Sequence, residues 1–219
     1  MDRLVYTVLS GLGARSRGQA VTANNLANAQ TTGFRREVLV AEGRYLAADA
    51  LPSRAQSGSP SLATPQQAGR TSATGRPLDI ALNGDAWLAV RDGTGEAYTR
   101  RGDLSVSVSG LLQTGDGRLV LGSNAAPISI PPGAMLEIGA DGSLTARAGD
   151  TATQLGRLKL VDGRGLDGRD KNPDGLFRAD QPLPPDAAAT LTVGALEAAN
   201  VEAAGLLADL VEQARGFEI

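Results

Sequence analysis

The chain has 219 residues and a net charge of −3, which is enough length to bury a core in one large or two small domains. It contains no cysteine and no histidine, which excludes disulfides, thiolate metal sites, cysteine nucleophiles and histidine-dependent triads. Charges of both signs are interspersed, so no basic surface for nucleic acid is indicated. With 28 glycines and only 3% aromatic residues, the composition favours short strands and tight turns over a deep ligand pocket. We therefore expect a protein that is not an enzyme, with no catalytic residues, cofactor or metal.

Residues 3–28 follow the periodicity of an amphipathic helix. The apolar positions share one side of that helix: Leu4, Val5, Val8, Leu9, Leu12, Ala20, Ala23, Leu26 and Ala27. Gly11, Gly13 and Gly18 each cost roughly 1 kcal/mol relative to alanine, so the helix is marginal alone and needs a partner surface. The same stretch has no apolar run long enough to span a bilayer, and the helical pattern fits it better than a cleaved signal peptide does.

The last twenty residues predict a second helix, with Asn200 as its N-cap and Glu202 in its first turn. Its apolar stripe keeps helical spacing almost without interruption: Ala203, Leu206, Leu207, Leu210, Val211, Ala214 and Phe217. The stripe still continues at Phe217 and no stop signal follows it. Two amphipathic helices at opposite ends of the chain, each needing a partner, are suited to pairing and assembly.

Between the helices the sequence changes in character. Residues 48–77 contain four prolines and many small polar residues, so we interpret residues 35–75 as an extended linker. From Leu78 onward strand-like runs recur about every ten residues, among them "LDIAL", "WLAV", "PISI" and "SLTAR", and Asp-Gly dipeptides punctuate them. The predicted fold is mainly β, with a β-rich domain over 76–197 and a discontinuous helical domain formed by 1–34 and 198–219.

One acidic loop raises an alternative function. The stretch "DGRGLDGRDKNPDG", residues 162–175, carries Asp162, Asp167, Asp170 and Asp174. Calcium needs six or more oxygen ligands, and both the EF-hand spacing and its closing glutamate are absent, so we interpret the stretch as a solvated loop. A calcium-dependent β-domain binding module remains the alternative from another class. The adjacent Arg35 and Arg36 are interpreted as solvated surface.

Residues 23–34, "ANNLANAQTTGF", resemble the N-terminal signature of the flagellar basal-body rod and hook proteins, in which a helix ends in Asn-Asn-Leu-Ala-Asn and the chain turns at Thr-x-Gly-Phe. Further blocks match the family in order: "TGRPLDIALNGDAWLAV", "AYTRRGDLSVSVSGLLQTGDGRLVLG", "IGADGSLTA", "LGRLKLV" and "GALEAANVEAAGLLADLVEQARGFE". The resemblance covers essentially the whole chain outside residues 48–73.

The resemblance implies terminal helices that pair as a coiled-coil-like inner domain, with the β domain outside. Asparagine tolerates capping geometry and glycine a left-handed turn, so the motif would end one helix and redirect the chain, with Phe34 as an apolar anchor. The assembly residues expected on this basis are Leu4, Val5, Val8, Leu12, Leu26, Asn24, Asn25, Asn28, Gly33, Phe34, Leu206, Leu207, Leu210, Val211, Ala214 and Phe217.

Within the family, "MDRLVYTVLSG" and "GDAWLAV" resemble the proximal-rod members, because distal-rod members more usually have Gly-Phe-Phe at residues 86–88. A distal-rod protein remains the alternative. The resemblance implies other rod subunits and copies of the chain as partners, and a place in the rod within the periplasmic space. It also implies export by the flagellar type III apparatus without a cleaved signal. The family's C-terminal helix normally continues beyond the position of Glu218, whereas this chain ends at Ile219.

Overall fold

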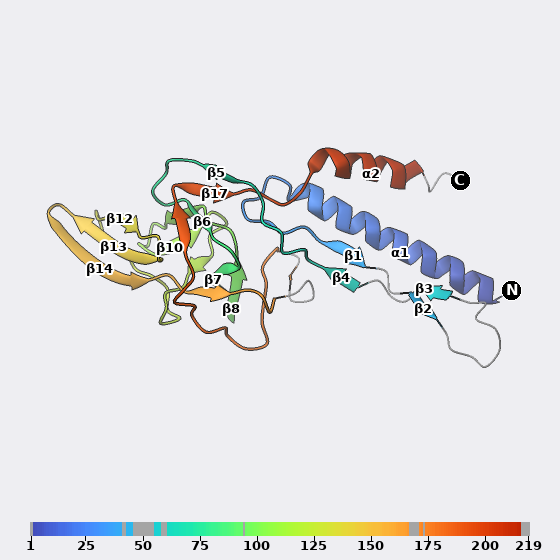
Figure 1. Ribbon diagram of the computed structural model, residues 1–219, viewed down its shortest axis with the longest axis horizontal. Coiled ribbons are helices and arrows are strands. Elements are labelled where there is room, and N and C mark those ends of the chain that lie inside the picture. Colours follow the sequence, from blue (N-terminus) through green and yellow to red (C-terminus); the bar gives the residue numbers. More distant parts are fainter. Residues whose placement is uncertain are drawn as a thin grey trace. The chain divides into compact units, whose positions relative to one another are not determined.

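The computed structural model describes residues 2–40, 43–45, 55–57, 61–93, 95–166, 171–172 and 174–215. The chain divides into two compact units. The first, here called the helical unit, comprises Met1–Ala29, Arg36–Gln66 and Val201–Ile219; the second, the β unit, comprises Gln30–Arg35 and Gln67–Asn200. The fold is mainly β with one helix near each end of the chain, as the sequence predicted (Figure 1). Neither described helix is apolar over enough of its length to cross a membrane.

In the helical unit, α1 (Asp2–Ala27) and α2 (Ala203–Arg215) lie side by side (Figure 1). The Gln213 amide donates a hydrogen bond of 3.5 Å to Thr22 Oγ1 between the two helices. Strand β1 (Val38–Val40) packs on α1, and a Cβ added at Gly18 would lie 3.9 Å from Leu39 Cδ1. A side chain at this position would make only an ordinary van der Waals contact, so the approach of β1 to α1 does not require glycine.

Residues 35–75, which we expected to be an extended connection, contain paired strands. Strand β1 pairs antiparallel with β4 (Ser61–Ala63), and β2 (Gly43–Tyr45) pairs antiparallel with β3 (Ala55–Ser57). The last part of this segment forms β5 (Thr71–Ala73), which pairs with β17 (Ala195–Glu197) in the β unit. The small polar residues of this region are thus compatible with two-stranded pairing.

The start of α2 differs from the expectation. The helix begins at Ala203, so Asn200, predicted as its N-cap, lies three residues before it. Asn200 belongs to the β unit, where its backbone N–H donates to the carbonyl of Phe34 (3.2 Å) and its side-chain amide donates to the carbonyl of Gln67 (2.9 Å). These bonds hold the residue outside the helix.

The β unit contains most of the described strands, and their described pairings are antiparallel. The pair β6 (Ile80–Leu82) and β16 (Leu191–Val193) accompanies β5 and β17. A six-stranded sheet consists of β7 (Ala86–Asp92), β8 (Gly95–Thr99), β9 (Leu104–Val106), β10 (Leu112–Thr114), β11 (Leu119–Val120) and β15 (Leu160–Asp162). A three-stranded sheet consists of β12 (Met135–Ile138), β13 (Ser143–Ala148) and β14 (Thr151–Arg157).

Asp-Gly turns were predicted correctly where they join neighbouring strands. Gly117 between β10 and β11 has φ 85°, and Gly142 between β12 and β13 has φ 81°, values that glycine reaches without a steric penalty. The run "PISI" was predicted as a strand, but its residues form only isolated bridges. Strand β10, by contrast, was not singled out, because its alternation spans only three residues.

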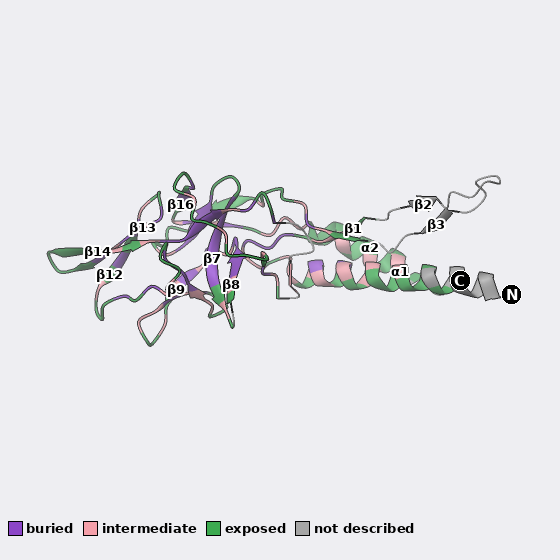
Figure 2. Cartoon of the chain, turned by 90° about the horizontal axis from the view of Figure 1, so that it is seen from below, coloured by how far each residue is buried: buried purple, intermediate pink, exposed green. Residues whose placement is uncertain are grey.

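The core lies on both faces of β7, whose residues 86–90 are all buried (Figure 2). Because side chains alternate along a strand, Leu88 and Val90 enter the larger apolar cluster, while Trp87 and Ala89 enter a smaller one. Trp87 contacts Phe177 edge-on, with ring centroids 4.6 Å apart. A strand covered on both faces is the structural centre of the β unit.

We predict that Leu88→Ala lowers the free energy of unfolding of the β unit by about 2–5 kcal/mol, because it removes a fully buried side chain and leaves a cavity. Urea denaturation followed by tryptophan fluorescence measures this through Trp87. Leu207→Ala is the matched control, since Leu207 is 53% exposed. A change of less than about 1 kcal/mol for Leu88→Ala would contradict the proposed position of the core.

Candidate assembly site

Asparagines lie at the C-terminal end of α1: Asn24 and Asn25 are in its last turn and Asn28 follows it. The backbone N–H and the side-chain amide of Asn28 both donate to the carbonyl of Asn24, at 3.1 and 3.0 Å. The same amide donates to Asn24 Oδ1 at 2.9 Å. The Asn24 carbonyl thus accepts a side-chain donor in addition to its i+4 backbone N–H, so the asparagine side chains add hydrogen bonds at the end of the helix. Their role in assembly stays a prediction.

Asn25 makes a different connection and is 3% exposed. Its side-chain Nδ2 donates to the carbonyl of Glu37 (2.7 Å), and the backbone N–H of Glu37 donates to Asn25 Oδ1 (2.8 Å). Only an uncharged amide offers a donor and an acceptor in this arrangement, so aspartate could not replace it. Asn25 thus fixes the backbone leading into β1 against the end of α1.

The turn that follows belongs to the β unit. Gly33 has φ 68°, and a Cβ there would lie 2.3 Å from the backbone carbonyl of Arg100, so no other residue fits. The Gly33 N–H donates to the carbonyl of Glu197 at 2.8 Å. Phe34 is buried, and Lys171 Nζ lies 3.9 Å from the centroid of its ring. The predicted anchoring role of Phe34 therefore has a physical basis in the β unit.

A buried ionic cluster lies next to this turn. The Glu197 carboxylate forms ion pairs with Arg35 and with Arg100, and all three side chains are 2% exposed. Arg100 Nε donates to Glu197 Oε2 at 2.7 Å, and the backbone N–H of Gly69 donates to Oε1 at 2.8 Å. Arg100 also donates to the backbone carbonyls of Leu82, Gly84 and Ala86.

Sequence reasoning missed this cluster. Arg35 was interpreted as solvated surface, and Glu197 was not singled out. Burial lowers the pKa of Arg35 from its usual value, while the Glu197 charge acts in the opposite direction. A weak signal was available in the sequence, because alternation along a strand places Glu197 on the same face as the apolar Ala195.

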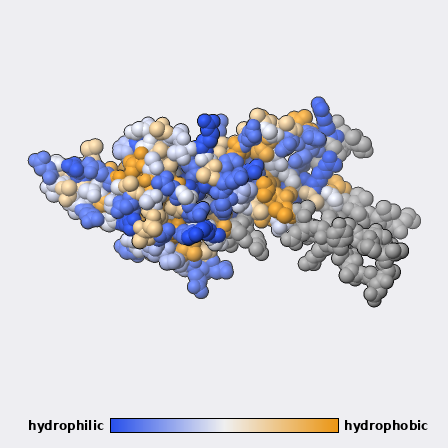
Figure 3. Space-filling view, in the orientation of Figure 1, coloured by the Kyte–Doolittle hydropathy of each residue, from blue (hydrophilic) through white to orange (hydrophobic). Residues whose placement is uncertain are grey.

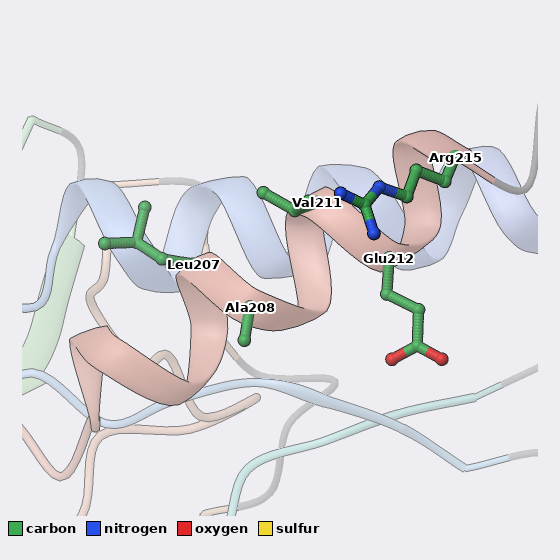
Figure 4. Close-up of a pocket in the computed structure, with 5 residues that line it drawn as sticks. All are labelled: Leu207, Ala208, Val211, Glu212 and Arg215. Atoms are coloured by element: carbon green, nitrogen blue, oxygen red, sulfur yellow. The ribbon is translucent and has the colours of Figure 1, made fainter.

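The two helices present aliphatic side chains to solvent. Leu9 is 63% exposed and Leu12 is 49% exposed on α1; Leu207 and Val211 on α2 are each 53% exposed. Figure 3 shows hydrophobic surface on the helical unit, and Figure 4 shows Leu207, Val211 and Arg215 following one side of α2, with Ala208 and Glu212 beside them.

The other expected assembly residues fall into three groups. Leu26, Leu206 and Leu210 are partly buried. Leu4, Val5, Val8 and Ala214 lie in the described helices, but their side chains are outside what the structure describes. Phe217 lies outside the described residues altogether.

The acidic loop over 162–175 is described only in part, since Asp167 and Asp170 lie outside the described residues. The other two carboxylates are paired with arginines: Asp162 with Arg164, and Asp174 with Arg118 at 2.8 Å. Within the described part of the chain, no group of three or more acidic side chains is arranged to hold a metal ion.

Comparison with known proteins places this architecture in a family. The family model described as "Flagella basal body rod protein" matches residues 5–35, which include α1 and the asparagine motif. The model described as "Flagellar hook protein FlgE/F/G D1 domain" matches residues 81–146 in the β unit.

Whole-length relatives give the same result. The chain is 37% identical to the flagellar basal-body rod protein FlgF of Escherichia coli over 232 residues, which covers all of this chain and 91% of the relative. FlgF of Salmonella typhimurium is also 37% identical, over all of this chain and 91% of the relative. FlgG of Bacillus subtilis is 31% identical, over all of this chain and 92% of the relative. The chain therefore belongs to the flagellar basal-body rod protein family that includes FlgF and FlgG.

We predict that Glu197→Gln lowers the free energy of unfolding of the β unit by about 3–5 kcal/mol, because two buried guanidinium groups lose their counter-charge. Urea denaturation measures the loss. Glu137→Gln is the matched control: Glu137 is 54% exposed in its pair with Arg147, so that change stays within about 1 kcal/mol. Equal effects of the two substitutions would show that the buried cluster is not a principal contributor to stability.

Proposed function

We propose that the chain is a structural subunit of the proximal part of the flagellar rod, and that it polymerises through its terminal helices. The identity of 37% to FlgF relatives, against 31% to a FlgG relative of similar coverage, supports the proximal assignment. The second candidate is a distal-rod subunit, because the FlgG relative also covers the whole chain. Neither candidate involves catalysis or a cofactor.

The observation that carries the proposal is the exposure of Leu9, Leu12, Leu207 and Val211 on the helices. Fully burying one aliphatic side chain contributes about 1.5–3 kcal/mol, so covering four half-exposed ones contributes several kcal/mol to association. Gly11 and Gly13 have no atom near the position of a Cβ, which leaves room for another helix to approach. These are the properties of a surface that is completed by neighbouring subunits.

The proposed role of each segment follows from this exposed apolar surface of the helices. Residues 1–34 and 198–219 form an inner, coiled-coil-like assembly domain, residues 35–75 connect it, and residues 76–197 form an outer β domain. The partners are other rod subunits, proximal and distal, and copies of the chain itself. The assembled rod lies in the periplasmic space and transmits torque, and its subunits reach it through the flagellar type III apparatus without a cleaved signal.

We predict that Val211→Asp abolishes or strongly reduces incorporation into rods, because it places a charge in the surface that neighbouring helices cover. Incorporation is measured by immunoblotting purified basal bodies, and motility gives the second readout. The stability of the free subunit should stay within about 0.5 kcal/mol of wild type, since Val211 is exposed. Val108→Asp is the matched control, because Val108 is fully exposed in the β unit. Normal incorporation of the Val211 variant would contradict assembly through the helices.

A complementation experiment separates the proximal from the distal assignment. We expect the chain to restore motility to a strain that lacks its own proximal-rod protein FlgF, and not to a strain that lacks FlgG. The host should be the source organism, so that the neighbouring subunits match. Restoration only in the strain lacking FlgG would establish the distal alternative.

A further inference from the structure

Asn83 and Gly84 form the only Asn-Gly pair in the sequence, and they begin an exposed turn between β6 and β7. The Ala86 N–H donates to the carbonyl of Asn83 at 3.2 Å, which closes the turn. Gly84 occupies the second position of this turn with φ 55°. No atom lies within 4 Å of the point where a Cβ of Gly84 would stand, and both residues line an open hollow of about 290 Å³. Water therefore has access to the turn.

An asparagine in such a place can react with its own backbone. Asparagine is thermolabile, because the backbone nitrogen of the next residue can attack its side-chain amide carbon. The new C–N bond closes a succinimide ring, and the side-chain nitrogen leaves as ammonia with the proton from the backbone nitrogen. Water then opens the ring at either of its carbonyl carbons. The product is aspartate or isoaspartate, and in isoaspartate the main chain runs through the side-chain methylene.

The Gly84 nitrogen is available for this attack. Glycine has no Cβ beside its nitrogen, and among the described residues the Gly84 N–H donates no hydrogen bond. Asn124, which also lies in an exposed turn of the β unit, gives a direct comparison. Its successor Ala125 has nearly the same φ, 57°, but carries a Cβ and donates its N–H to the carbonyl of Gly122 at 2.8 Å. The two asparagines therefore differ in access to the attacking nitrogen.

Two threonine hydroxyls hold the Asn83 side chain. Asn83 Nδ2 donates to Thr190 Oγ1, and Thr192 Oγ1 donates to Asn83 Oδ1, each at 3.2 Å. Ring closure brings the amide carbon to bonding distance from the Gly84 nitrogen, so the carboxamide must leave the threonines first. Both threonines are exposed, and water competes for bonds of this kind. The hydroxyls thus slow the reaction without preventing it.

The turn is also bonded to the buried ionic cluster. Arg100 Nη1 donates to the carbonyl of Gly84 at 2.8 Å, and the same side chain pairs with Glu197. Isoaspartate in place of Asn83 adds a methylene to the main chain directly before Gly84 and so displaces this carbonyl. Aspartate carries the same new charge but leaves the main chain unchanged. Only the isoaspartyl product therefore loosens the contact between the turn and Arg100.

We propose that Asn83 is a site of spontaneous deamidation, at which the Gly84 nitrogen closes a succinimide, and that Thr190 and Thr192 set the rate. Water is the only co-reactant. Over the life of the subunit, the reaction converts the turn into an isoaspartyl form that holds Arg100 less firmly. The proposal goes beyond the assigned rod function and does not depend on it.

Peptide mass spectrometry of the full chain, incubated at mildly alkaline pH, tests the site. We expect the mass gain of deamidation at Asn83, with isoaspartate as a product, while Asn124 in the same sample stays unchanged. Isoaspartate is the informative product, because direct hydrolysis of the side chain gives only aspartate. Absence of isoaspartate at Asn83, or an equal rate at Asn124, would overturn the proposal.

A pair of double variants tests the role of the threonines. Thr190→Ala with Thr192→Ala should accelerate the reaction at Asn83 by about five-fold, the factor that corresponds to the loss of one side-chain hydrogen bond. Thr71→Ala with Thr153→Ala, at exposed threonines in other strands of the same unit, is the matched control and should leave the rate unchanged. Equal rates in the two double variants would contradict the restraining role.

Urea denaturation tests the consequence for the fold. The deamidated fraction, isolated by anion exchange through its extra negative charge, should unfold at a lower urea concentration than Asn83→Asp. This variant has the same charge and an unaltered main chain, so it isolates the effect of the added methylene on the bond from Arg100 to Gly84. Equal midpoints for the two proteins would overturn the proposed loosening.

Discussion

The burial of one carboxylate, that of Glu197, is the interaction on which the β unit most depends. A buried charge is costly unless opposite charges and hydrogen-bond donors surround it. Here two guanidinium groups and the Gly69 N–H supply both. The partners come from distant parts of the sequence: Arg35 follows the N-terminal turn, Arg100 follows β8, and Glu197 ends β17. The cluster therefore joins both terminal approaches of the chain to the central sheet within one unit, and it forms only when all three segments are in place.

The helical unit differs from the β unit in that it leaves much of its apolar surface exposed. Its first helix contains glycines that weaken it, and both helices leave aliphatic side chains exposed. A helix of this kind gains its stability from packing rather than from its own sequence. The β unit is stabilised by contacts within the subunit, whereas the helices leave apolar surface that the proposed assembly would bury.

Local chemistry made the helices, the Asp-Gly turns and the β-rich character predictable. Each of these depends on residues within a few positions of one another, such as the glycine of a turn at positive φ or the spacing of an apolar stripe. The pairing of Arg35 with Glu197 bridges 162 residues, and no local pattern indicates which carboxylate an arginine will meet. The same limit explains Asn200, whose sequence context fits a helix cap but whose bonds are to Phe34 and Gln67. Sequence reasoning singled out the asparagine motif with Gly33 and Phe34, and it missed the buried ionic cluster next to that turn.

The motif over residues 23–34 has two parts, which make their contacts in different units. Its asparagines act in the helical unit, where the Asn28 amide donates to the Asn24 carbonyl and the Asn25 amide donates to the Glu37 carbonyl. Its Gly-Phe pair acts in the β unit, where only glycine fits against the Arg100 backbone and Phe34 is enclosed. Each half makes its hydrogen bonds within a separate unit. The two halves are joined by the short stretch of chain between Asn28 and Gly33.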